Sequence, residues 1–283
     1  MKIAVAQVLS TEDPQVNLEL IRTYTARAVQ QGADAVVFPE AMHCAFGNPL
    51  VPIAEETDGP WAQEVRSIAG RHGVLIIAGM FTPGTASGAG RPRVRNTLLA
   101  VGRGVDVTYD KIHLYDAFGF RESDTVEPGA TPQLIRLDGV TLGLATCYDV
   151  RFPALFQHYA REGADAVVVS ASWGAGEGKI RQWETLVRAR ALDATCHVVA
   201  CDQPDPWVVG REPVEGAPTG VGHSAVIGPA GQELAVAGTG NELILATVDP
   251  TVVVSTRQVL PVLANGAQGE KAAGMRSADP VRS

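Results

Sequence analysis

The sequence predicts an α/β protein, because short apolar runs alternate with longer amphipathic segments along most of the chain. The apolar runs are rich in valine, isoleucine and alanine, as is typical of strands that are buried on both faces. The predicted strands are Lys2–Val8, Ala35–Phe38, Val74–Phe81, Asn96–Val101, Val140–Thr146, Ala166–Ser170 and His197–Cys201.

The amphipathic segments have apolar residues at helical spacing and end at suitable stop signals. Gly32, Gly73 and Gly163 follow three of them, and Pro60 stands at a favourable first position of another. The predicted helices are Asp13–Gln31, Pro60–His72, Pro153–Glu162 and Ile180–Thr195.

The last part of the chain has a different pattern. Strand-like runs follow one another through tight turns at Gly228–Gly231 and Gly238–Asn241, which indicates antiparallel strands. These runs are Gly222–Ile227, Gln232–Ala237 and Leu243–Val248. We expect a single domain over residues 1–263 and a mobile tail or dimer arm over 264–283, because the tail has little apolar content.

A short pattern recurs in the chain. Gly32-Ala33-Asp34-Ala35-Val36-Val37 returns as Gly163-Ala164-Asp165-Ala166-Val167-Val168, and each copy joins a predicted helix to a predicted strand. The repeat suggests two related strand–helix–strand halves, the second of which begins near Val140. Chance similarity is the alternative, because such junctions favour these residue types.

Bulk properties exclude several classes of partner. The net charge is −8 and no run is rich in lysine or arginine, so we expect neither nucleic acid nor an anionic membrane as a partner. No apolar run approaches the length of a membrane span, and the N-terminus lacks the length of a signal peptide. The four cysteines form no CxxC pair, which argues against a metal site and a disulfide framework. We therefore expect a cytoplasmic protein with reduced thiols.

Several polar residues stand at or near the ends of predicted strands. Cys147 directly follows Val140–Thr146, and Glu40 follows Ala35–Phe38 by way of a proline. Ligands of open α/β sheets bind at the carboxyl ends of strands, so the thiol is a candidate nucleophile and Glu40 a candidate base. Lys111 is a candidate for offsetting negative charge on an intermediate, and Glu122 a candidate for holding that lysine. Taken singly, each residue has an ordinary structural role as its alternative.

Taken together, these segments resemble the signature blocks of the nitrilase superfamily of carbon–nitrogen hydrolases. The blocks are Phe38-Pro39-Glu40, Tyr109–Leu114 and Cys147–Pro153, and they occur in the family's order. The resemblance extends from about Lys2 to Leu263. Supporting matches are Asn96-Thr97, Glu127–Gly129, Trp183 with Arg188–Ala191, and Gly222–Pro229.

The resemblance implies a four-layer α-β-β-α sandwich whose subunits pair through helices into a homodimer or a higher homo-oligomer. It also implies a catalytic set of Glu40, Lys111 and Cys147, with Glu122 as a second glutamate. In this scheme the thiol forms a thioester, Lys111 and the backbone N–H of Tyr148 stabilise the oxyanion, and no metal or organic cofactor takes part. Neither His113 nor His197 is needed as a base; His113 is expected to support the Lys111 loop.

The residues after the cysteine narrow the expected substrate to a small amide that carries a carboxylate. Tyr148–Pro153 resembles the ω-amidase and deaminated-glutathione-amidase group, whereas nitrile-hydrolysing relatives usually have tryptophan and glutamate there. Arg151 then has two open interpretations: it binds the substrate carboxylate, or it bonds internally to Glu40 or Asp149 and fixes the loop. Tyr148 and Trp173 are candidate pocket walls, with packing as the alternative. The loops expected to set specificity are Phe46–Asp58, Pro83–Arg95 and Gly174–Lys179.

Other functions stay open at the level of sequence. Hydrolysis of N-carbamoyl amino acids is the main alternative, and nitrile hydrolysis is a weaker one. Two further alternatives are an inactive binding scaffold of the same fold and the ammonia-releasing part of a glutamine-dependent synthetase that works with a separate partner.

Overall fold

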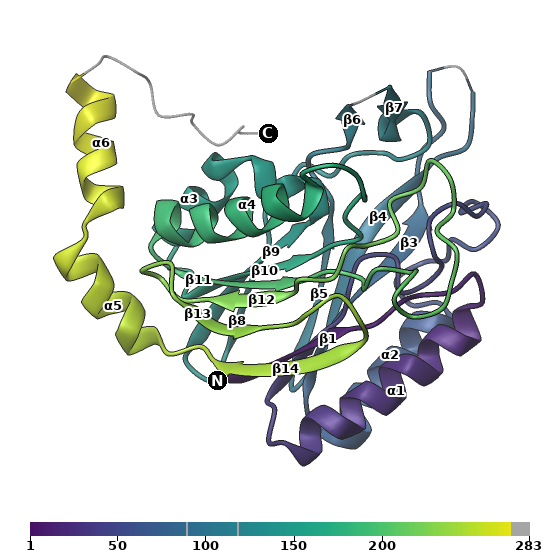
Figure 1. The fold of residues 1–283 in the computed structure, drawn as a ribbon, viewed down its shortest axis with the longest axis horizontal. Helices are drawn as coiled ribbons and strands as arrows, with labels where there is room; N and C mark the ends of the chain where they lie inside the picture. Colours follow the sequence, from purple (N-terminus) through teal and green to yellow (C-terminus); the bar gives the residue numbers. More distant parts are fainter. Residues whose placement is uncertain (89, 118, 273–283) are drawn as a thin grey trace.

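The computed structural model describes residues 1–88, 90–117 and 119–272. Its core is a pair of six-stranded sheets (Figure 1). The first sheet has the order β14-β1-β2-β3-β4-β5. Its strands are β1 (Lys2–Gln7), β2 (Ala35–Val37), β3 (Leu75–Pro83), β4 (Val94–Gly102), β5 (Val105–Asp110) and β14 (Glu242–Thr247).

The second sheet has the order β13-β12-β11-β10-β9-β8. Its strands are β8 (Leu134–Leu137), β9 (Val140–Thr146), β10 (Ala166–Ser170), β11 (His197–Cys201), β12 (Ala225–Ile227) and β13 (Glu233–Val236). A small hairpin, β6 (Asp116–Ala117) with β7 (Phe120–Arg121), lies apart from both sheets.

Helices cover the outer faces, so the molecule has the predicted four layers (Figure 1). Apolar residues of α1 and α2 pack on the outer face of the first sheet, and those of α3 and α4 on the outer face of the second. The inner faces of the two sheets pack on each other through side chains such as Val5, Val37, Leu144 and Val168. The helices are α1 (Pro14–Gln30), α2 (Pro60–His72), α3 (Pro153–Arg161), α4 (Lys179–Ala194), α5 (Pro250–Val259) and α6 (Val262–Ala272), with short 3-10 helices η1 (Glu122–Asp124) and η2 (Cys147–Arg151).

The two sheets repeat one topology, in agreement with the repeated sequence pattern. In the first sheet, β1, β2 and β3 are parallel and are flanked by antiparallel β14 and β4. In the second, β9, β10 and β11 are parallel and are flanked by antiparallel β8 and β12. The repeated residues lead into β2 and β10, which hold the same place in each sheet.

The structure adds elements that the sequence analysis did not predict. Strand β5 and helices α5 and α6 were not among the expected elements, and β14 leaves its sequence neighbours β12 and β13 to pair with β1 in the other sheet. The expected tail begins inside α6, so its first part is helical, and residues 273–283 lie outside the described residues. In the described ranges, no helix is both long enough and apolar enough to span a membrane.

Candidate active site

The candidate residues come from the carboxyl ends of strands in both sheets. Glu40 follows β2 and Lys111 follows β5, which runs parallel to β3 because two antiparallel steps separate them. Cys147 follows β9 directly, and Ser172 follows β10. The sheets meet at this end: the Ser172 backbone N–H donates to Glu40 Oε2 at 2.9 Å.

Cys147 opens the turn between β9 and α3 in an unusual backbone conformation. Its φ is +46°, in the left-handed region that non-glycine residues rarely adopt and that costs of order 1–3 kcal/mol. Its Sγ lies 3.8 Å from the Ser172 carbonyl oxygen. The strained turn leaves the thiol at the wall of a cavity while 9% of the residue is exposed.

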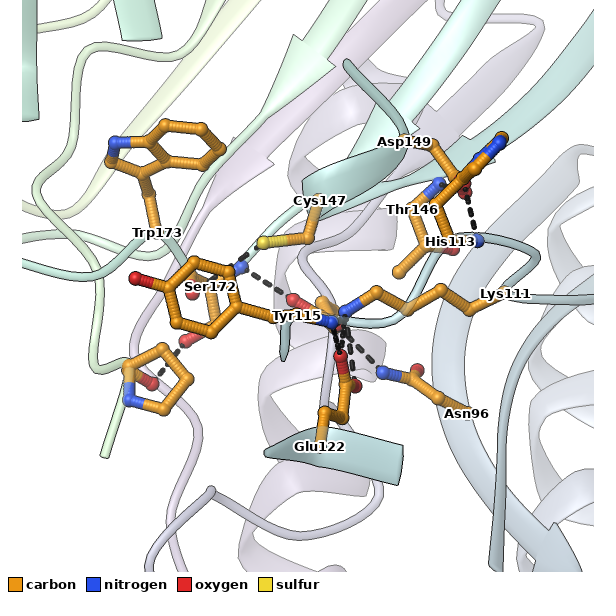
Figure 2. A network of polar contacts seen from close by, with 12 residues as sticks. Asn96, Lys111, His113, Tyr115, Glu122, Thr146, Cys147, Asp149, Ser172 and Trp173 are labelled. Atoms are coloured by element: carbon orange, nitrogen blue, oxygen red, sulfur yellow. Dashed lines mark hydrogen bonds and ion pairs between the residues drawn. The ribbon is translucent and has the colours of Figure 1, made fainter. Parts of the chain in front are cut away.

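Buried Asp149 joins this turn to the segment that carries Lys111. Its Oδ2 accepts from the Thr146 backbone N–H at 2.8 Å and from the Tyr109 hydroxyl at 2.6 Å. Its Oδ1 accepts from the His113 backbone N–H at 3.0 Å and lies 2.7 Å from His113 Nδ1 (Figure 2). Because Tyr109 and His113 stand two residues either side of Lys111, Asp149 fixes the lysine relative to the thiol. His113 therefore supports the Lys111 loop, as expected.

Lys111 lies between two buried carboxylates (Figure 2). Its Nζ is 3.2 Å from Glu40 Oε1 and 2.9 Å from Glu122 Oε2. Asn96 Nδ2 donates to Glu40 Oε1 at 2.6 Å, so together with Ser172 each oxygen of Glu40 has a donor. Glu40, Lys111 and Glu122 thus form one hydrogen-bonded cluster. Asn96 also belongs to it, although the sequence analysis noted Asn96 only as a supporting match.

Burial and charge set the protonation of this cluster. Burial raises the pKa of Glu40, with the ammonium of Lys111 opposing the rise. Burial alone lowers the pKa of Lys111, but the carboxylates of Glu122 and Glu40 outweigh it and raise that pKa well above its ordinary value. Burial, reinforced by the charge of Glu40, raises the pKa of the Cys147 thiol well above its usual range. The Cys147 thiol is therefore neutral at rest.

A cavity of about 460 Å³ is lined by the charged residues of the cluster and by Cys147. Each loop that we expected to set specificity contributes to it, through Phe46–Pro52, through Pro92 with Val94, and through Gly174 with Lys179. The segment Glu215–Pro218 and the side chains of Tyr115 and Phe120 also line it, and the sequence analysis did not single them out. Tyr148, Arg151 and Trp173 belong to the lining as well.

Arg151 does not take the internal partners that its structural interpretation named. Its Nη2 donates to Gln182 Oε1 at 2.7 Å, and its guanidinium lies 5.1 Å from the Trp173 ring and 5.8 Å from the Tyr148 ring. Within the described residues, neither Glu40 nor Asp149 forms an ion pair with it.

Asp202 is a buried carboxylate that the sequence analysis missed. It follows β11, and its oxygens accept from the backbone N–H groups of Trp173 at 2.7 Å and Val221 at 2.9 Å. Burial raises the pKa of Asp202 to about 7. Its position at a strand end, like that of Glu40, was the available signal. Across the described part of the chain, no cluster of histidine, cysteine, aspartate or glutamate is arranged to hold a metal ion.

Comparison with known proteins decides the family. The sequence model of the protein family described as Carbon-nitrogen hydrolase matches residues 2–258. The chain belongs to the carbon–nitrogen hydrolase family. Among curated members, Hydrolase Rv0480c of Mycobacterium tuberculosis is 49% identical over 94% of this chain and 95% of its own, and Deaminated glutathione amidase of Escherichia coli O157:H7 is 33% identical over 94% and 97%.

Solved structures of carbon–nitrogen hydrolases have the same fold. Nit3 of Saccharomyces cerevisiae, a member of branch 10 of the nitrilase superfamily, superposes with a TM-score of 0.75 and 26% identity over 93% of this chain and 94% of its own. Because its family is that of the carbon–nitrogen hydrolases and its relatives include a named amidase, this protein is an amide-hydrolysing enzyme of the nitrilase superfamily.

Proposed function

We propose that this enzyme hydrolyses a small amide bearing a carboxylate, through a thioester on Cys147, and releases ammonia and an acid. The observation that carries the proposal is the convergence of Glu40, Lys111 and Cys147, from three separate strand ends, on one buried cavity. Glu122 binds the same Lys111 ammonium that contacts Glu40.

The first half of the reaction forms the thioester. Glu40 takes the proton from Cys147 Sγ as the sulfur bonds to the amide carbon, and the C=O electron pair moves to oxygen. Lys111 Nζ and the backbone N–H of Tyr148 stabilise the oxyanion, with each such donor contributing about 3–4 kcal/mol. The C–N bond then breaks as Glu40 gives its proton to the leaving nitrogen. The raised pKa of Glu40 suits a group that both takes and returns a proton.

The second half releases the acid. Glu40 removes a proton from water, whose oxygen attacks the thioester carbon, and the C–S bond breaks as the proton returns to Cys147. Every step uses side chains and backbone groups of this chain, so the scheme needs neither metal nor organic cofactor.

The substrate carboxylate is assigned to Arg151. Its guanidinium lines the cavity four residues after the nucleophile and donates to the neutral amide of Gln182, which leaves donors for a carboxylate. The kinship with a relative named deaminated glutathione amidase supports an amide of this kind. N-carbamoyl amino acids also carry a carboxylate, and they remain the second candidate substrates.

An ammonia-release screen tests the proposal. The substrates are ω-amides of dicarboxylic acids, N-carbamoyl amino acids and simple nitriles. Cys147→Ala should reduce turnover by at least about a thousandfold without lowering the melting temperature. Cys44→Ala is the matched control, because Cys44 is also buried but does not line the cavity. Near-normal hydrolysis by the Cys147 variant would overturn the mechanism.

For assembly, we propose a homodimer formed through the outer helices of the second sheet and its neighbours. Exposed apolar side chains support this: Val259 of α5 is 85% exposed and Val254 is 56% exposed, and Leu192 of α4 is also exposed. Light scattering on the purified protein should give at least twice the chain mass of 29.8 kDa. A mass of one chain at micromolar concentration contradicts the dimer. Cytoplasmic location stays a prediction.

A further inference from the structure

Two cationic side chains from different elements face the cavity beside the thiol. Arg151 is the last residue of η2, which begins at Cys147, and Lys179 is the first residue of α4. Both line the cavity together with Cys147, and both are half-buried. The first turn of α4 also brings the positive end of the helix dipole to this side of the cavity.

The other charged groups that line the cavity are either ion-paired with each other or exposed to solvent. Lys111 forms ion pairs with both Glu40 and Glu122. Glu215, the remaining carboxylate of the lining, is exposed to solvent. Arg151 donates to a neutral amide, and among the described residues no carboxylate lies within ion-pair distance of it.

Lys179 contacts an aromatic wall of the same cavity. Its Nζ lies 3.5 Å from the Tyr115 hydroxyl oxygen and 5.7 Å from the ring centre. Burial, followed by the charge of Arg151, lowers the pKa of Lys179. The two cations therefore repel each other across a space that is partly withdrawn from water, and an anion placed in that space relieves the repulsion.

We propose that Lys179 and Arg151 together form an anion subsite beside Cys147, which holds the free carboxylate of the substrate and makes Lys179 a determinant of specificity. The inference rests on the proposed function and adds a residue and a charge requirement to it. Carboxylated amides are then preferred over neutral amides of the same size, because only the charged group bridges the two cations.

The test compares alkylation of Cys147 by iodoacetate and by iodoacetamide, which differ mainly in charge. In the wild-type protein, the ratio of the two rate constants should exceed that of a free thiol. Lys179→Met and Arg151→Met should each lower the iodoacetate-to-iodoacetamide ratio by about tenfold, as expected for loss of one charged hydrogen bond. Using the ratio cancels any change in the reactivity of the thiol itself.

Arg181→Met is the matched control. Arg181 lies two residues further along α4 and is exposed, and it does not line the cavity. Its loss should change the ratio by less than about twofold, because exposed charges act weakly at this range. An equal effect of all three substitutions reveals general attraction by surface charge and overturns the subsite.

Hydrolysis separates this inference from the proposed function. Lys179→Met should lower kcat/KM for an ω-amide about tenfold or more and leave a neutral amide within about twofold. If the wild-type enzyme hydrolyses amides but shows no preference for the carboxylated one, the subsite is wrong and the proposed chemistry stands. If alkylation shows the charge preference but no amide is cleaved, the proposed function fails instead.

Discussion

Replacing Lys111 with methionine tests how the buried charge cluster is held together. The substitution keeps a long unbranched side chain and removes the one ammonium that lies between Glu40 and Glu122. Removing one partner of a buried ion pair typically costs about 3–5 kcal/mol. All three side chains are at most 6% exposed, so we expect Lys111→Met to lose at least this much of the free energy of unfolding near pH 8.

The loss should depend on pH. Burial already raises the pKa of Glu40 and the ammonium of Lys111 opposes that rise, so removing the ammonium should raise this pKa further above the value of about 4.3 expected in the unfolded chain. Raised folded-state pKa values mean that the protonated forms favour folding. Their contribution is complete below the unfolded pKa and is lost as the pH rises through the folded pKa. The gap between wild type and variant should therefore be smaller at pH 5 than at pH 8.

Urea unfolding, followed by tryptophan fluorescence at both pH values, measures this gap. Adding Glu122→Gln to Lys111→Met should recover about 1–2 kcal/mol at pH 8, because one uncompensated buried carboxylate becomes a neutral amide. Lys2→Met is the control: Lys2 is exposed and its ammonium donates to the carbonyl of Gln31, so the loss of this charge should cost less than about 1 kcal/mol. A loss below about 1 kcal/mol for Lys111→Met, or an equal loss at both pH values, refutes the reasoning.

Two further predictions concern the backbone of the site and its pH dependence. A Cβ on Gly79 would lie 2.6 Å from Ala41 N and 2.9 Å from Glu40 Cα. Gly79→Ala should therefore displace Glu40, cost about 1–3 kcal/mol of stability and lower kcat. The control is Gly70→Ala in α2, whose Cβ would meet nothing within 4 Å and which should leave kcat unchanged. Burial raises the folded pKa of Asp202 to about 7, so the contribution of its protonated form to stability is complete below about pH 4 and lost as the pH rises to about 7. In urea unfolding, the free energy of unfolding of Asp202→Asn relative to wild type should therefore be more favourable at pH 8 than at pH 5. An equal difference at both pH values contradicts this.

Much of the fold was predictable because its central strands are buried on both faces. Runs such as Val140–Thr146 and Ala166–Ser170 have nearly continuous apolar sequences, and they match β9 and β10 in their bounds. Strand β5 (Val105–Asp110) is only partly buried and contains charged residues, so its composition carries no such signal. Pairing at a sheet edge, which depends on β4, makes it a strand.

The sequence of helix α5 contains both strand-favouring residues and a helix-capping pattern. Its sequence is rich in valine and threonine, which favour strands, yet Pro250 stands at its first turn and Asp249 caps it. The Asp249 side chain accepts from the Thr251 backbone N–H at 2.9 Å. The capping pattern, rather than the propensity of the valines, decided the structure.

The candidate site divides in the same way. Glu40, Lys111 and Cys147 were predicted because each belongs to a block that resembles a signature of the family, and Glu40 and Cys147 also follow predicted strands. Asp202 and Lys179 belong to no block, and their positions depend on contacts between segments far apart in the sequence. Asp202, for example, joins segments on either side of it by accepting two backbone N–H groups. Such contacts depend on packing that periodicity and composition do not encode.

In the proposed mechanism, the charges of the cluster explain why the Cys147 thiol and Glu40 act together. With Lys111 between Glu40 and Glu122, a cluster of two carboxylates and one ammonium is already negative by one charge. A resting thiolate on Cys147 adds a second negative charge to a region withdrawn from water, and the raised pKa of that thiol reflects this cost. Moving the proton from sulfur to Glu40 keeps the total charge constant while the new charge passes to the amide oxygen. The proposed mechanism therefore forms the thiolate only when a substrate carbonyl is present to accept the charge.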